Sequence, residues 1–210
     1  MASVCVVIKK PVMSIQVLLS TMIMMTVNIS TTPFYSLKDK VSLSLHFIAK
    51  EEGSFHTLVH LMDQRLSYMK DVAAYKWVNK LPIEDVQREE IVLAKSMSAA
   101  GQFGLDSLST RSFFETQISL AKTIQQFWFD QWTREGFVTY DYADLKTEIR
   151  PALLELGDDI LKTIAELQPW QFGRGEKRQA KRLLLKEILV KGQKKRDRLP
   201  LYTAIFKIQP

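Results

Sequence analysis

Three basic residues in the first half of the chain are the strongest candidates for chemistry. Arg65 and Lys76 are eleven positions apart. On an α-helix this spacing is about 20° from three full turns, so both residues lie on the same side of the helix, about 16 Å apart along its axis. Arg88 follows, with Asp85 and Glu89 beside it. Taken singly, such cations usually extend into solvent, and such clusters are usually surface ion pairs. Together, the three cations could converge on a small anion that carries carboxylates, to which arginine binds in a bidentate manner.

A glutamine interrupts an apolar stripe further along the chain. Gln125 lies between Ala121 and Trp128, near the stripe that holds Ile118 and Trp132. A buried amide is costly unless it is hydrogen-bonded, so Gln125 either sits at the stripe edge or faces a ligand. The sequence has no nucleophile–base pair and no glycine-rich phosphate loop. The chemistry we expect therefore depends on the placement of charge, and Asp85 or Glu89 could accept from a substrate hydroxyl.

Composition excludes several other classes of protein. The single cysteine, Cys5, excludes a disulfide framework and a cysteine-based zinc site, and the three histidines (His46, His56 and His60) precede the central region. We expect no metal. Of the net charge of +6, residues 172–198 alone contribute +8, with eleven Lys/Arg and three Asp/Glu, which leaves about −2 for the rest. The basic charge is confined to this tail, so we expect no nucleic-acid partner.

The N-terminal segment has the order of a secretory signal. Residues 11–37 contain no charged residue, follow Lys9 and Lys10, and include the apolar stretch 17–27 before small polar residues. The apolar stretch is shorter than the roughly 20 residues of a spanning helix, so we expect no stable membrane span in the mature protein. Residues 1–36 are therefore predicted to be a signal peptide or leader, and the protein to be periplasmic or secreted. An uncleaved anchor and a start at Met13 stay open as alternatives.

The elements that must position the candidate residues are all predicted to be helices. Apolar residues recur at three- and four-residue steps over 55–79, from Pro82 to Ser98, from Ser109 or Thr110 to Gly136, and from near Pro151. No period-2 run indicates a strand. We predict an all-α protein, a helical bundle, with a catalytic helical domain at 37–170. Residues 171–210 are predicted to be a basic C-terminal extension that is helical in part. This extension either packs its apolar side against the protein or lies on anionic lipid.

Two ordered motifs carry a family resemblance. Val-Ala-x-x-Lys-Trp ends at Trp77, and Leu-Pro-Ile-Glu-Asp-x-x-Arg ends at Arg88. The run 117–125 agrees with them. This region, about residues 58–168, resembles the all-helical chorismate mutases, and within them the exported subclass. The resemblance implies cofactor-free Claisen rearrangement of chorismate to prephenate, and a homodimer with a complete site in each chain.

The same resemblance implies a role for each candidate residue. Arg65 should hold a substrate carboxylate, while Lys76 and Gln125 hydrogen-bond the ether oxygen, where negative charge develops as the C–O bond breaks. Arg88 should frame the site, and Asp85 and Glu89 should contact the ring hydroxyl.

The sequence departs from the family pattern at two positions. Asp159 falls near the place of an arginine in the exported subclass, and the nearest cation of the fourth helix is Arg150. Ala121 replaces a hydroxyl that touches a carboxylate in relatives. The alternative interpretation is a non-catalytic secreted bundle of the same fold that binds an anionic partner or a membrane surface through its basic tail.

Overall fold

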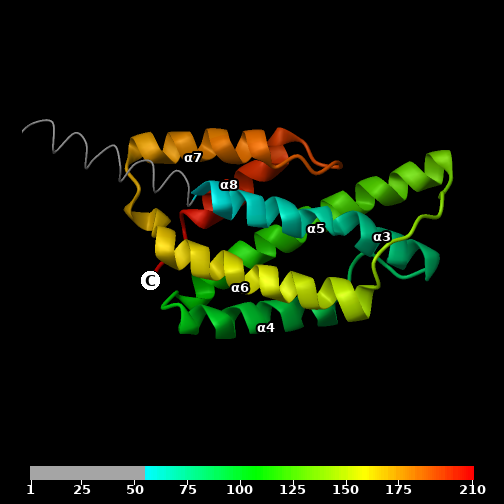
Figure 1. Ribbon diagram of the computed structural model, residues 1–210, viewed down its shortest axis with the longest axis horizontal. Helices are drawn as coiled ribbons and strands as arrows, with labels where there is room; N and C mark the ends of the chain where they lie inside the picture. Colours follow the sequence, from blue (N-terminus) through cyan, green and yellow to red (C-terminus); the bar gives the residue numbers. More distant parts are fainter. Residues whose placement is uncertain (1–54) are drawn as a thin grey trace, which may run out of the picture. The chain divides into compact units, whose positions relative to one another are not determined.

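The computed structural model describes residues 55–210, and the predicted leader at 1–36 lies outside them (Figure 1). Residues 55–67 are helical. The elements that follow are α3 (Met69–Val78), α4 (Val86–Gln102), α5 (Ser107–Glu135), the π-helix η1 (Leu145–Ile149), α6 (Arg150–Leu167), η2 (Pro169–Gln171), α7 (Arg174–Glu187), η3 (Lys195–Arg198) and α8 (Leu199–Ile205). Residues 55–210 contain no strand, so the predicted all-α class is confirmed.

The first predicted helix is interrupted at a single residue. Tyr68 is a turn between the helix 55–67 and α3, but its backbone stays right-handed helical and its carbonyl accepts from the Val72 N–H at 3.0 Å. The helix direction is therefore carried across the turn. Leu58, Met62 and Leu66 on one side of it are fully buried, as the apolar periodicity predicts.

The predicted start of the second helix at Pro82 is wrong. Helix α4 begins at Val86, because the Asp85 carboxylate accepts from the Arg88 N–H at 3.1 Å and caps the helix there. Pro82 lies in the loop that precedes it. The helix continues past the predicted end at Ser98, to Gln102.

Helix α5 also begins earlier than predicted. Its cap is Asp106 and not Ser109 or Thr110, since the Asp106 carboxylate accepts from the Ser109 N–H at 2.8 Å. Its predicted end is confirmed, because Gly136 follows Glu135 with a φ of 84°, a left-handed conformation that favours glycine. Helix α5 is the longest of the described helices and contacts α3, α4 and α8.

One apolar core extends from residue 55 to the C-terminal helices. Ile124 of α5 and Ile160 of α6 belong to the same buried cluster as Leu184 of α7 and Ile205 of α8. In Figure 1, α7 and α8 lie beside each other, and α6 runs next to α4. The domain boundary at residue 170 stays a prediction; side chains on both sides of it share this core.

Candidate functional site

A cavity of about 120 Å³ lies between the helix 55–67, α3, α4, α5 and α6. All six residues singled out in the sequence line it, namely Arg65, Lys76, Asp85, Arg88, Glu89 and Gln125. Apolar side chains from several elements complete the wall, including Met69, Val72 and Ile118. Residues from Arg65 to Leu154, far apart in the sequence, thus surround one space.

Arg65 is a buried cation with unused hydrogen-bonding capacity. It is only 5% exposed, and in the described part of the chain its Nε has no partner. The guanidinium carbon lies 5.7 Å from the centre of the Phe114 ring. Burial lowers the pKa of Arg65 to about 10. The interpretation of Arg65 as a solvated surface cation is therefore wrong, and an anion in the cavity would supply the missing partner.

Lys76 is positioned by the loop before α4. Its ammonium donates to the Ile83 carbonyl at 2.5 Å, which leaves two further N–H donors. The residue is 9% exposed, so it is also not a solvated cation. Burial lowers the pKa of Lys76, and the nearby carboxylates of Asp85 and Glu89 oppose this shift.

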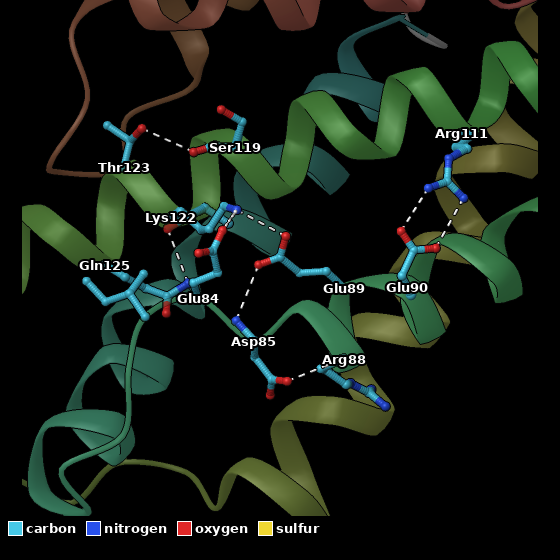
Figure 2. A network of polar contacts seen from close by, with 12 residues as sticks. Glu84, Asp85, Arg88, Glu89, Glu90, Arg111, Ser119, Lys122, Thr123 and Gln125 are labelled. Carbon is cyan, nitrogen blue, oxygen red and sulfur yellow. Dashed lines mark hydrogen bonds and ion pairs between the residues drawn. The ribbon is translucent and has the colours of Figure 1, made fainter.

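The two carboxylates of the site are partly used in holding α4. Asp85 caps the helix, and the Asp85 N–H in turn donates to Glu89 Oε1 at 3.5 Å. The other oxygen of Glu89 accepts from Lys122 Nζ at 3.0 Å (Figure 2). Lys122 also donates to Glu84 at 3.3 Å. Asp85, Arg88 and Glu89 therefore form the lining of a cavity, and not an isolated surface cluster.

Gln125 is buried, so the alternative that it sits at the exposed edge of the apolar stripe is wrong. It is 5% exposed. Its amide nitrogen donates to the Ala121 carbonyl at 3.3 Å and lies 3.8 Å from the Met69 sulfur. Its amide oxygen has no partner among the described residues. Both N–H donors of the amide therefore have an acceptor, and the weak contact with the Met69 sulfur is the one that a ligand oxygen could replace.

Two more cations line the cavity. Lys122 was not singled out in the sequence, although it precedes Gln125 by three residues and so lies on the same side of α5. Arg150 lies at the start of α6. It follows the π-helix η1, where the Ile149 N–H donates to the Asp144 carbonyl five residues earlier at 2.9 Å. The one extra residue of a π-turn rotates the side chains that follow by about 100°.

The cavity carries an excess of positive charge. Arg65, Lys76, Arg88, Lys122 and Arg150 face Asp85 and Glu89, which is five cations against two carboxylates, a formal balance of +3. Burial, together with the neighbouring Arg150, lowers the pKa of Arg88, while Asp85 opposes the shift. This arrangement fits a small dianion held among preorganised donors.

Comparisons with known proteins agree on one family. Residues 56–126 match the family described as chorismate mutase type II. A secreted chorismate mutase of Yersinia pestis is 40% identical over 106 residues, which are 50% of this chain and 56% of that protein. A monofunctional chorismate mutase of Enterobacter agglomerans is 29% identical over 157 residues, 74% of this chain and 84% of that protein.

A solved structure extends the similarity to the fold. The crystal structure of the secreted chorismate mutase from Yersinia pestis superposes with a TM-score of 0.66 at 29% identity, covering 72% of this chain and 96% of that one. This chain is similar in sequence and in fold to the type II chorismate mutases. In the curated comparison it spans only 56% of the length of the secreted Yersinia protein.

The two departures from the chorismate mutase pattern have different outcomes in the structure. Asp159 is exposed and does not line the cavity, whereas Arg150 does. Ala121 lines the cavity and offers no hydroxyl. Within residues 55–210, no group of three or more His, Cys, Asp and Glu side chains could hold a metal ion. No helix in that range is both long enough and apolar enough to cross a membrane.

Proposed function

We propose that this protein is a chorismate mutase, which converts chorismate to prephenate by a cofactor-free Claisen rearrangement. The observation that carries the proposal is the buried Arg65, whose Nε has no partner in the described chain, in a cavity with four further cations. Chorismate is a dianion, and a formal balance of +3 favours its binding. The similarity to the type II chorismate mutases supports the same reaction.

Seven polar residues of the cavity have a role in this proposal. Arg65 and Arg150 hold the two carboxylates, and Arg88 frames the site. Lys76 and Gln125 donate to the ether oxygen as its C–O bond breaks and the new C–C bond forms. Both donors are held in place before the reaction, by Ile83 and Ala121 respectively, so charge development requires little reorganisation.

The carboxylates and the apolar walls of the cavity contribute positioning. Asp85 and Glu89 accept from the ring hydroxyl with the lone pairs that α4 and Lys122 leave free. The apolar walls hold the substrate in the compact conformer in which its reacting carbons are close. No proton, electron or group is exchanged with the protein, so the reaction needs neither nucleophile nor cofactor.

Loss of chorismate absorbance, with prephenate identified by NMR, tests the proposal on the purified full chain. We expect saturable conversion of chorismate. Arg150→Ala should lower kcat/KM by about 30- to 1000-fold, which is the effect of one lost charged donor. The exposed Arg134→Ala serves as the matched control and should retain activity. A folded chain without turnover would favour the alternative of a non-catalytic bundle.

We further propose that residues 1–36 are removed on export and that the mature protein is a periplasmic or secreted homodimer. The order of basic, apolar and small residues supports export, as does the similarity to a secreted relative. Mass spectrometry of protein from the periplasm or medium tests it, since an intact mass that retains Met1 to Leu37 would contradict cleavage. Light scattering of the mature protein tests the dimer.

A further inference from the structure

Helix α7 carries a row of cations on its outer side. Arg174, Arg178, Arg182 and Lys186 recur at four-residue spacing, and all four are exposed. Each step along this row rises about 6 Å, so the row is about 18 Å long. Figure 1 shows α7 at one edge of the helices, with α8 on its inner side.

None of these four cations is in an ion pair, a hydrogen bond or a ring contact within residues 55–210. The two carboxylates of α7 are engaged elsewhere: Glu176 accepts from the Gly173 N–H, and Glu187 lies 3.0 Å from His56. Like charges four residues apart destabilise a helix. Within residues 55–210 no ion pair of these side chains offsets that repulsion, and only Lys186 lies in the last turn, where the helix dipole favours a cation.

The opposite side of α7 fixes the direction in which the row points. Ala180 and Leu184 are buried in the core. Lys177 and Lys181 lie over the rings of Phe206 and Tyr202, at 5.5 and 5.8 Å from their centres. The helix cannot roll without exposing these apolar contacts, so the row stays on the outer side of α7.

The segment after α7 extends this surface. Leu189 is 74% exposed directly after the helix, and Lys191, Lys194, Lys195 and Arg196 are exposed beyond it. An exposed leucine within a cationic surface suits the boundary between lipid headgroups and acyl chains. Single-stranded nucleic acid, in contrast, is bound by exposed aromatic platforms, and the nearby Tyr202 is half-buried against α7.

We propose that this face, the four cations of α7 with Leu189, docks the protein on an anionic phospholipid surface. The contact is peripheral, because the apolar side of α7 stays in the core. Each cation near such a surface should raise the partition coefficient about fivefold, and salt should weaken binding because the charges are exposed. The proposal does not depend on the enzymatic activity.

Vesicle sedimentation of the full chain tests the proposal. The probes are vesicles of phosphatidylcholine alone and of phosphatidylcholine with about one-third phosphatidylglycerol, at about 0.1 M salt. We expect binding to the anionic vesicles to exceed binding to the neutral ones. The variant Arg174→Gln, Arg178→Gln, Arg182→Gln, Lys186→Gln should lose about 600-fold in anionic partition, which is four factors of about five. The variant and the parent chain both keep residues 1–36, so any contribution of the predicted leader is the same in the two proteins.

A charge-matched control separates position from net charge. The control carries glutamine at four exposed cations outside α7, Lys80, Arg134, Lys146 and Lys162, and should bind the anionic vesicles as the parent chain does. Equal loss in both variants, or equal binding by parent and α7 variant, would overturn the proposal. So would preference for duplex DNA over the vesicles. Circular dichroism checks that the variants fold. If the α7 variant misfolds, the salt dependence of the parent chain still tests the proposal, because binding that does not weaken with salt would overturn it.

Discussion

The Lys76 ammonium is subject to opposing influences. Burial lowers its pKa, the carboxylates of Asp85 and Glu89 raise it, and Arg150 and Lys122 lower it, with a lowered pKa as the result. A lysine donates to the ether oxygen most strongly when protonated. Activity should therefore be lost as the pH rises through this lowered pKa, before an ordinary exposed lysine would lose its proton.

The pH profile also reports on Gln125. An amide donates at every pH, so we expect kcat/KM of the parent chain to stay nearly flat from weakly acidic to weakly alkaline pH. Gln125→Glu should move the optimum to acid, because an ionised carboxylate would repel the developing charge in a buried site. Superimposable profiles of kcat/KM for the two proteins would show that Gln125 does not contact the reacting oxygen.

Lys122 should act as a positioning residue for Glu89. Its ammonium links Glu84 of the loop to Glu89 of α4, and these partners raise its pKa. We expect Lys122→Gln to lower kcat/KM by about tenfold through loss of substrate orientation, and Lys122→Arg to restore most of it. The exposed Lys162→Gln is the control. Full activity in Lys122→Gln, or failure of the arginine to rescue, would contradict this role.

At the scale of elements, one residue at the start of α4 contributes both to the stability of the fold and to the cavity. Asp85 is both its N-cap and a lining residue of the cavity. Asparagine is a comparable cap, whereas alanine is not, so Asp85→Ala should cost about 1 kcal/mol of folding stability and Asp85→Asn much less. Both should reduce kcat/KM, because both remove the carboxylate. Denaturant unfolding measures the first effect, and equal stability of the two variants would contradict the capping role.

The sequence predicts the helices better than their boundaries. Apolar periodicity identified the helical segments, and Gly136 marked the end of α5, because both signals are local. The predicted start of α4 was wrong because Pro82 and Asp85 offer competing start signals, and in the structure the Asp85 cap is the one that is used. The cavity-lining position of Arg150 depends on a π-turn, for which the sequence carries no periodic signal.

For the molecule as a whole, the C-terminal residues close the fold. The Asp106 N–H donates to the Gln209 carbonyl at 2.9 Å, next to the start of α5, and Ile208 is fully buried. Ile208→Ala should therefore lower the free energy of unfolding by about 2–4 kcal/mol. Thermal melting measures this, and kcat at low temperature should change little. An unchanged Tm would mean that residues 171–210 are separable from the helices that surround the cavity.

The central claim is that the cavity around Arg65 rearranges a dianion, and one variant tests it most directly. Arg65→Met removes a buried charge whose Nε lacks a partner in the described chain but keeps most of the side-chain volume. We expect kcat/KM for chorismate to fall by about 30- to 1000-fold while the Tm holds or rises, because burying an unpaired charge is unfavourable. Near-normal turnover in a folded Arg65→Met protein would contradict the account.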